Sequence, residues 1–283
     1  MKRMITLTSA ALFALPFAAQ ADEGTFVSDG VPLHYTDQGT GSAVVMLHAF
    51  AGSSVLWASN GLMPLDGFRV ISFDARGHGE SCKPTEADAY GTQMVDDVIR
   101  IMDDRGVETA HIVGYSMGAE TALKLATTYP DRVLSLVVAG SGWSGEAEAQ
   151  TYGFIADALG GVATFGDFMV AMAPDGNATS EEDMRTGIAM LSAHGISPDQ
   201  DAAPLAATAG AMHEVIGLSS ATLSAIDVPV LGIAGETDEE RKNVARLGDA
   251  IPDFSFVMIP DADHLSAPLA PLFTQTVSAF LKD

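Results

Sequence analysis

The chain has 283 residues, of which 47% are hydrophobic and 18% are charged, enough apolar material for one large buried core. Its 37 acidic and 14 basic residues give a formal net charge of −23 at pH 7. Such a charge repels polyanions, which argues against nucleic acid and anionic membrane surfaces as partners. The single cysteine, Cys82, excludes an internal disulfide. We expect Cys82 to be a small buried apolar residue, a free reactive thiol being the alternative.

The first 21 residues have the pattern of a secretory signal peptide. Lys2 and Arg3 precede an apolar stretch, and Ala-Gln-Ala at residues 19–21 forms a cleavage site of small residues. The apolar stretch is too short to span a bilayer, and no later run is long enough either. We therefore expect residues 1–21 to be removed, a periplasmic or secreted bacterial location, and no stable membrane insertion. Removing the two basic residues of this segment, which has no acid, changes the formal charge from −23 to −25.

Strand-like and helix-like segments alternate after the signal. Residues 26–35 predict a β-hairpin around an Asp-Gly turn, and residues 43–47 and 68–73 predict two further strands. A helix is predicted next, from Thr92 as its N-cap to an exit at Gly106. This alternation is typical of a mainly parallel sheet with helices on both faces.

The pentapeptide Gly-Tyr-Ser-Met-Gly at residues 114–118 has the pattern G-x-S-x-G. It follows an apolar run at 110–113 and precedes a helix-like stretch at 119–129, so it lies at a strand-to-helix turn. A G-x-S-x-G elbow holds its serine on a sharp, strained turn, and its glycines let the helix pack closely against the strand. Ser116 is therefore the predicted nucleophile, and a serine that only caps the helix is the alternative.

The alternation stops after a further strand at residues 133–138. From residue 144 to residue 217 no convincing strand is visible, and a capping box at 179–182 predicts the start of a helix. We expect residues 144–217 to be a helical insertion. Some of its Met and Phe side chains should be buried in a core, and others should form an apolar wall of a pocket. Residues 22–143 and 218–283 are then the core.

A nucleophilic serine needs a histidine as base, and in elbow-type hydrolases the order along the chain is serine, acid, histidine. Three of the seven histidines follow Ser116. His194 and His213 lie in helical stretches, where a histidine with a structural hydrogen bond is expected. His264 instead lies on a loop beyond the strand-like run 254–259. His264 is therefore the predicted base.

The acid is sought at a strand end in the same way. Residues 228–234 read as a buried strand, and Asp238 follows it on the next loop. Asp238 is the predicted acid, with Glu236 as the nearby competitor and a helix-capping role as the alternative. Asp261 and Asp263 are so close to His264 that we expect them to order its loop.

The tetrahedral intermediate of such a reaction needs backbone donors for its oxyanion. One should be the N–H of Met117, the residue after the nucleophile, and the other an N–H from the loop after an earlier strand. That loop is residues 48–53, after the strand 43–47, and Phe50 is the predicted second donor. The Phe50 ring can belong to the core at the same time, because only its backbone is used.

These motifs, in this order, resemble the α/β-hydrolase superfamily over nearly the whole mature chain. Residues 74–81 match the D-x-R-G-x-G-x-S turn of its lipase, esterase and perhydrolase-like branch, which we interpret as structural. Ala49 replaces a glycine that is usual in the family before the oxyanion residue. The resemblance implies an α/β fold with a mainly parallel sheet of about eight strands, helices on both faces, and residues 144–217 as the helical lid.

The predicted function is hydrolysis of a carboxylic ester, thioester or lactone through an acyl-enzyme, without cofactor or metal. The apolar insertion predicts an uncharged acyl substrate of small to medium size. The resemblance also admits a carbon–carbon bond hydrolase or a perhydrolase with a similar triad, and some members of the fold only bind a ligand. Dehalogenase and epoxide hydrolase activities are disfavoured, because those relatives have aspartate where this chain has Ser116. The sequence predicts no oligomeric state.

Overall fold

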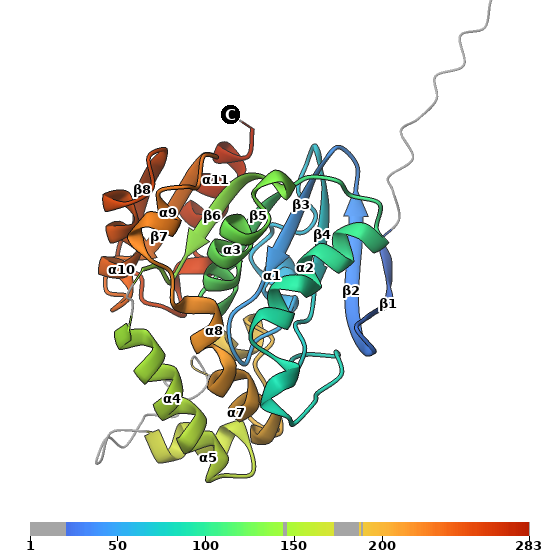
Figure 1. Cartoon of the computed structure of the whole chain (residues 1–283), viewed down its shortest axis with the longest axis vertical. Coiled ribbons are helices and arrows are strands. Elements are labelled where there is room, and N and C mark those ends of the chain that lie inside the picture. The colour runs from blue at the N-terminus through green and yellow to red at the C-terminus, as the bar shows by residue number, and fades with distance from the viewer. Residues whose placement is uncertain (1–20, 144–145, 173–186, 188, 283) are drawn as a thin grey trace, which may run out of the picture.

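An eight-stranded β-sheet is the centre of the structure, a computed structural model that describes residues 21–143, 146–172, 187 and 189–282 (Figure 1). The strand order across the sheet is β1-β2-β4-β3-β5-β6-β7-β8. The strands are β1 (Asp22–Ser28), β2 (Val31–Gly39), β3 (Ser42–Leu47), β4 (Phe68–Phe73), β5 (Ala110–Tyr115), β6 (Val133–Ala139), β7 (Val230–Gly235) and β8 (Phe254–Ile259).

Only the first two strand pairs of the sheet are antiparallel. β1 pairs with β2 and β2 with β4 in this way, and every pair from β4 to β8 is parallel. Asp29 and Gly30 join β1 to β2 with φ values of 47° and 80°, the positive pair that a type I′ hairpin turn requires. The predicted mainly parallel sheet is confirmed.

Helices cover both faces of the sheet because successive side chains of each strand point to opposite faces. Val45 and Leu47 of β3 belong to the core cluster on one face, while Val44 and Met46 belong to the cluster on the other. The first cluster contains side chains of α2 (Thr92–Asp104), α3 (Met117–Thr128), α8 (His213–Ile216) and α9 (Ser220–Leu223), and the second those of α1 (Val55–Ser59) and α11 (Pro271–Phe280).

The chain between β6 and β7 forms further helices at one end of the sheet (Figure 1). These are α4 (Glu146–Gly160), α5 (Phe165–Met172) and α7 (Ala202–Ala211), and they share a small apolar core with Ala51 of the β3–α1 loop. We call this group the cap. The predicted capping box at 179–182 lies outside the described residues. No helix in the described ranges is long and apolar enough to cross a membrane.

Trp143 joins the two ends of the segment that contains the cap. Its indole N–H donates to the Leu218 carbonyl at 3.0 Å, and the Arg246 guanidinium lies 4.3 Å from the centre of its ring. The chain therefore leaves the core after β6 and returns to it at the same place. Arg246 belongs to α10 (Arg241–Arg246), the short helix after β7.

Two local predictions were wrong. The N-cap of α2 is Gly91, not Thr92, because the Glu214 carboxylate of α8 accepts from the Thr92 N–H and takes over the capping. Gly91 has a φ of 64°, and a side chain there would collide with Glu214. Cys82 is exposed, not buried: its backbone N–H and carbonyl are both hydrogen-bonded, so only its side chain faces solvent.

Candidate active site

Ser116 lies at the turn between β5 and α3, with a φ of 54° that residues other than glycine seldom adopt. Two glycines make this turn sterically feasible. A Cβ on Gly114 would lie 2.3 Å from the Gly118 carbonyl oxygen, and one on Gly118 would lie 2.1 Å from that of Leu47. The Ser116 N–H also donates to the Ala139 carbonyl of β6 at 2.7 Å. The elbow therefore presents the serine hydroxyl at the end of the sheet.

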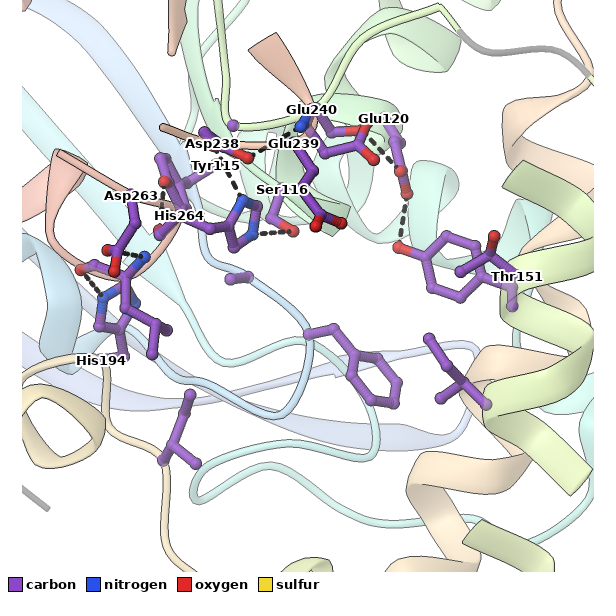
Figure 2. Close-up of a pocket in the computed structure, with 18 of the residues that line it drawn as sticks. Tyr115, Ser116, Glu120, Thr151, His194, Asp238, Glu239, Glu240, Asp263 and His264 are labelled. Carbon is purple, nitrogen blue, oxygen red and sulfur yellow. Dashed lines mark hydrogen bonds and ion pairs between the residues drawn. The ribbon is translucent and has the colours of Figure 1, made fainter. Parts of the chain in front are cut away.

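The structure brings Ser116, His264 and Asp238 into one hydrogen-bonded chain (Figure 2). His264 Nε2 lies 3.1 Å from Ser116 Oγ, and His264 Nδ1 lies 3.0 Å from Asp238 Oδ2. The Asp238 side chain is 1% exposed, whereas that of His264 is 38% exposed. A buried carboxylate at Nδ1 places the ring proton on that nitrogen and leaves the Nε2 lone pair directed to the serine.

Neighbouring strand ends hold the acid and the base in place. The other oxygen of Asp238 accepts from the Glu240 N–H at 2.9 Å. The Thr237 N–H donates to the Ala262 carbonyl at 2.9 Å, which joins the loops after β7 and β8. The buried Tyr115 hydroxyl donates to the His264 carbonyl at 2.6 Å. Both loops are thus tied to each other and to the residue that precedes the nucleophile.

The competing carboxylates of the same loops contact other groups. Glu236 accepts from the Asp261 N–H at 3.0 Å, so it binds the turn after β8 and not the His264 ring. Asp263 accepts from the Ser266 N–H and hydroxyl at 2.8 and 2.7 Å, and these hydrogen bonds lower its pKa.

His213, the second of the three histidines after Ser116, does not line the cavity at Ser116. Its ring is hydrogen-bonded to the Gly210 carbonyl at 2.9 Å.

Phe50 and Met117 lie on the two loops that meet at Ser116. Ala49 to Gly52 form a turn closed by a 3.0 Å backbone hydrogen bond, with Ala51 at a φ of 59°. In the part of the chain that the structure describes, neither the Phe50 nor the Met117 N–H donates to a protein acceptor. Two backbone donors therefore remain for a group bound at Ser116, as an oxyanion hole requires.

His48 fixes the loop that carries Phe50. Its Nε2 accepts from the Ala75 N–H at 2.9 Å, so the ring proton lies on Nδ1, which donates to the Ala49 carbonyl at 2.8 Å. Burial lowers the pKa of His48 and keeps the ring neutral, as this arrangement needs. His48 is therefore a structural link between the Phe50 loop and the turn at residues 74–81.

Asp74 organises that turn from within. Its two carboxylate oxygens accept from the Ser54 and Glu80 N–H groups, each at 2.8 Å. Burial would raise the pKa of Asp74, but His48 and these N–H donors outweigh it and lower the pKa. None of residues 74–81 lines the cavity above Ser116 that is described below, in keeping with the interpretation of the turn as structural.

His194 is a site residue that the sequence did not reveal. It lies between α5 and α7, where the helical context predicted an ordinary structural histidine. Its Nε2 donates to the Leu265 carbonyl, next to His264, at 2.8 Å, and its own carbonyl accepts from the Ser53 N–H at 3.0 Å. Burial lowers the pKa of His194 and favours the neutral ring. His194 thus contacts both the loop that carries His264 and the loop that carries Phe50. No motif in the sequence around His194 indicates these two contacts.

A cavity of about 750 Å³ opens above Ser116 and His264, between the strand ends and the cap. Its volume suits a small to medium ligand. The cap contributes a mainly apolar wall, and the strand ends contribute a polar one. No group of three or more His, Cys, Asp or Glu side chains within the described ranges could hold a metal ion.

Comparisons with known proteins agree with this architecture. A model of the α/β hydrolase fold family matches residues 42–183. Among solved structures, a thermophilic esterase from Thermogutta terrifontis is similar, with a TM-score of 0.74 and 26% identity over 93% of this chain and 98% of that one.

Two curated bacterial proteins are similar over part of their length. One is the dihydrolipoyllysine-residue acetyltransferase component of the acetoin cleaving system of Cupriavidus necator, 39% identical over 45% of this chain and 34% of that protein. The other is the 2-hydroxy-6-oxononadienedioate/2-hydroxy-6-oxononatrienedioate hydrolase of Burkholderia vietnamiensis, 36% identical over 43% of this chain and 45% of that protein. The chain thus spans less than half the length of these curated relatives. With the family match, the sheet order and the elbow taken together, the chain belongs to the α/β hydrolase fold family.

Proposed function

We propose that this protein hydrolyses a carboxylic ester, thioester or lactone through a covalent acyl-enzyme. The observation that carries the proposal is the continuous contact from Ser116 through His264 to the buried Asp238, at the floor of the cavity. A serine hydroxyl is a weak nucleophile, and a neutral imidazole within hydrogen-bond distance of it is the arrangement that activates it.

The reaction follows from this geometry in two halves. His264 Nε2 takes the Ser116 proton as Oγ attacks the carbonyl carbon, and the Phe50 and Met117 N–H groups bind the resulting oxyanion, each contributing roughly 3 kcal/mol. The oxyanion collapses, the imidazolium protonates the leaving alcohol, and an acyl-serine ester remains. A water molecule then attacks the acyl carbon, gives its proton to His264, and releases the acid with the serine restored. Asp238 stabilises the imidazolium in both halves.

The relatives support this reaction class but differ in their reactions. The structure from T. terrifontis is described as an esterase, and the curated relative from B. vietnamiensis is named as a hydrolase of 2-hydroxy-6-oxononadienedioate and 2-hydroxy-6-oxononatrienedioate. The same three groups serve either reaction. We favour ester cleavage because, of these two relatives, the esterase aligns with this chain over the larger share of both chains.

An active-site phosphonate tests the nucleophile directly. We expect one label per chain on Ser116, found by peptide mass analysis, together with turnover of p-nitrophenyl esters. Ser116→Ala and His264→Ala should each lower kcat by a factor of about 10³ or more, and the double variant should be little worse than either. Substantial activity with unchanged specificity in Ser116→Ala would remove Ser116 as the nucleophile. Turnover of vinylogous diketones but not of esters would assign the carbon–carbon reaction instead.

We further propose that the protein is exported and processed before Asp22. The small residues at 19–21 support this, as does the start of β1 at Asp22, directly after the predicted cleavage site. Mass analysis of protein recovered from the periplasm or medium should give an N-terminus at or near Asp22. A cytosolic protein that retains Met1 would contradict the proposal.

A further inference from the structure

His194 connects two loops of the active site from the cap side. It lies between α5 and α7, is 1% exposed, and lines the cavity. Its backbone carbonyl accepts from the Ser53 N–H, three residues after Phe50. Its ring Nε2 donates to the carbonyl of Leu265, the residue after His264. His194 therefore bridges the loop of the predicted oxyanion donor and the loop of the predicted base.

The backbone at His194 is packed tightly against the first of these loops. A Cβ on Gly52 would lie 2.9 Å from the His194 carbonyl oxygen, and a Cβ on Gly195 would lie 1.8 Å from the Ser53 hydroxyl oxygen. Gly195 also has a φ of 70°, a conformation that favours glycine. The main chain at His194 therefore has a fixed place relative to the Phe50 loop, and the ring extends from that place.

The loop of the base is held at two successive carbonyls. The Tyr115 hydroxyl donates to the His264 carbonyl at 2.6 Å, and His194 Nε2 donates to the Leu265 carbonyl at 2.8 Å (Figure 2). Both donors belong to buried side chains, whose ring centres lie 6.2 Å apart. The Tyr115 ring also packs on the His264 ring, at 5.5 Å. The base loop is thus fixed from the sheet by Tyr115 and from the cap by His194.

The His194 ring makes no other hydrogen bond among the described residues. Its Nδ1 is buried there without a partner. Because Nε2 carries the proton, Nδ1 is an unpaired acceptor, and burying such a group costs about 1–3 kcal/mol. A buried apolar side chain would avoid this cost. The polar ring therefore lowers stability at this position, and what it supplies is one donor to the base loop.

The charge state of the ring suits the same role. Burial is the largest cause that lowers the pKa of His194, and His264 lowers it further, whereas the contact with the Leu265 carbonyl and the charge of Asp263 oppose them. The ring is therefore neutral near pH 7. A neutral ring adds no positive charge beside the imidazolium that His264 becomes in the proposed reaction.

We propose that His194 is a positioning residue for the base. By binding the Leu265 carbonyl from the cap, it holds the His264 ring in line with the other two members of the triad. The inference rests on the proposed hydrolysis and adds to it a residue of the cap. A displacement of a reacting group by about 1 Å can lower a rate by a factor of roughly 10², so the loss of this hydrogen bond should be visible in kcat.

Three variants separate the donor from the shape of the ring. His194→Phe keeps a ring beside Tyr115, and His194→Leu keeps a buried apolar side chain, but both lose the donor. His194→Gln keeps an N–H group that can reach the Leu265 carbonyl. With p-nitrophenyl butyrate we expect the Phe and Leu variants to lower kcat by roughly 10- to 100-fold, with KM changed by less than about threefold. The Gln variant should stay within about threefold of the wild-type kcat.

The rate at which a phosphonate labels Ser116 gives a second readout, which needs no ester substrate. Labelling requires the base to take the serine proton, so its rate constant should fall with kcat in the Phe and Leu variants and recover in the Gln variant. His213→Phe and His213→Gln are the matched controls. The His213 ring also contacts a backbone carbonyl, but it is exposed and lies outside the cavity lining, so both rates should stay unchanged.

The outcomes distinguish the two proposals. If His194→Phe and His194→Leu keep the wild-type kcat and labelling rate, the inference is wrong and the proposed function stands. A loss in His194→Gln as large as in His194→Phe would also overturn it, because packing and not the donor would then matter. Failure of both donor-free variants to fold, judged by circular dichroism, would assign the hydrogen bond to stability instead. If the wild-type protein turns over no ester and Ser116 takes no label, the proposed function itself fails.

Discussion

Ser116 has a strained backbone conformation, with a φ of 54°. An L-residue in this region of φ and ψ costs of order 1–3 kcal/mol, and the surrounding loops stabilise the conformation. The strain places the hydroxyl beyond the strand end, where both His264 and a carbonyl carbon can reach it. Stability is thus given up at the position of the proposed nucleophile.

Substitution by glycine should reveal this strain. We expect Ser116→Gly to be more resistant to urea than Ser116→Ala, by about 1 kcal/mol in the free energy of unfolding, because glycine adopts positive φ without a Cβ clash. Both variants lack the hydroxyl and should be inactive, so alanine is the matched control. Equal stability of the two variants would show that the turn is not strained.

The acid of the triad can be tested against its neighbour. We expect Asp238→Asn to lower kcat/KM by a factor of about 10³ to 10⁴, because its amide would donate to the His264 ring and hold the wrong tautomer. Glu236→Gln should change it far less, since Glu236 contacts only the turn at Asp261. Steady-state kinetics of the two variants decide between them. Equal or reversed losses would move the acid to Glu236.

The close approach of Ser116, Asp238 and His264 was predictable because each follows a strand end that is visible in the sequence. Asp238 and His264 each come a few residues after an apolar run, and Ser116 sits in a short motif. His194 was not predictable in the same way. Its place at the site depends on its contact with Leu265, which lies far away in the chain and near only in the fold.

Among the secondary-structure elements, α3 has little space for a larger side chain at Gly118. Gly118→Ala would place a Cβ 2.1 Å from the Leu47 carbonyl oxygen, where backbone must shift. We expect this variant to lose several kcal/mol of stability and most activity. Gly153 of α4 is a helical glycine with nothing within 4 Å of such a Cβ, so Gly153→Ala should gain about 0.5–1 kcal/mol.

Thermal unfolding of these two glycine variants provides the measurement. A drop in the unfolding midpoint for Gly118→Ala and a rise for Gly153→Ala would be the expected pair of results. A neutral effect at Gly118 would mean that α3 can move away from β3 and that the elbow does not need close packing.

The strands were more predictable than the element ends. Residues 68–73 and 254–259 match β4 and β8 in full, because both runs are rich in β-branched and aromatic residues, although β4 is largely buried and β8 lies at the edge of the sheet with only Ile259 buried. The start of α2 was not predictable from Thr92, since Glu214, from a distant helix, supplies the cap. The arrangement of the cap was beyond prediction as well, because the apolar side chains of α4 and α7 are spread around each helix and do not mark one face as the buried one.

For the molecule as a whole, buried histidines make stability depend on pH. Burial lowers the pKa of His78 to about 3, and it also lowers the pKa values of His48 and His194. In the unfolded chain these rings titrate near 6.5, so below that pH the unfolded state binds protons that the native state does not. Stability should therefore fall as the pH falls from about 6.5, by up to about 1.4 kcal/mol per pH unit for each ring.

Urea unfolding at about pH 7.5, 6 and 5 measures this loss. We expect His78→Asn to flatten the dependence, because an amide can still donate to the Arg76 carbonyl that His78 Nδ1 contacts and cannot titrate. The lowered pKa values of Asp37 and Asp74 add a further loss only below about pH 4. Constant stability between pH 7.5 and pH 5 would be incompatible with neutral buried histidines.

The hydrogen bond between Trp143 and Leu218 has a consequence for how such a protein can change over time. The chain leaves the core and rejoins it at one stalk, so the intervening segment can be lengthened, shortened or exchanged without moving a strand. The elbow, the acid and the base all lie outside that stalk. The sheet therefore tolerates a change in the length of this segment, provided that the new segment again supplies a partner for the loops that His194 contacts.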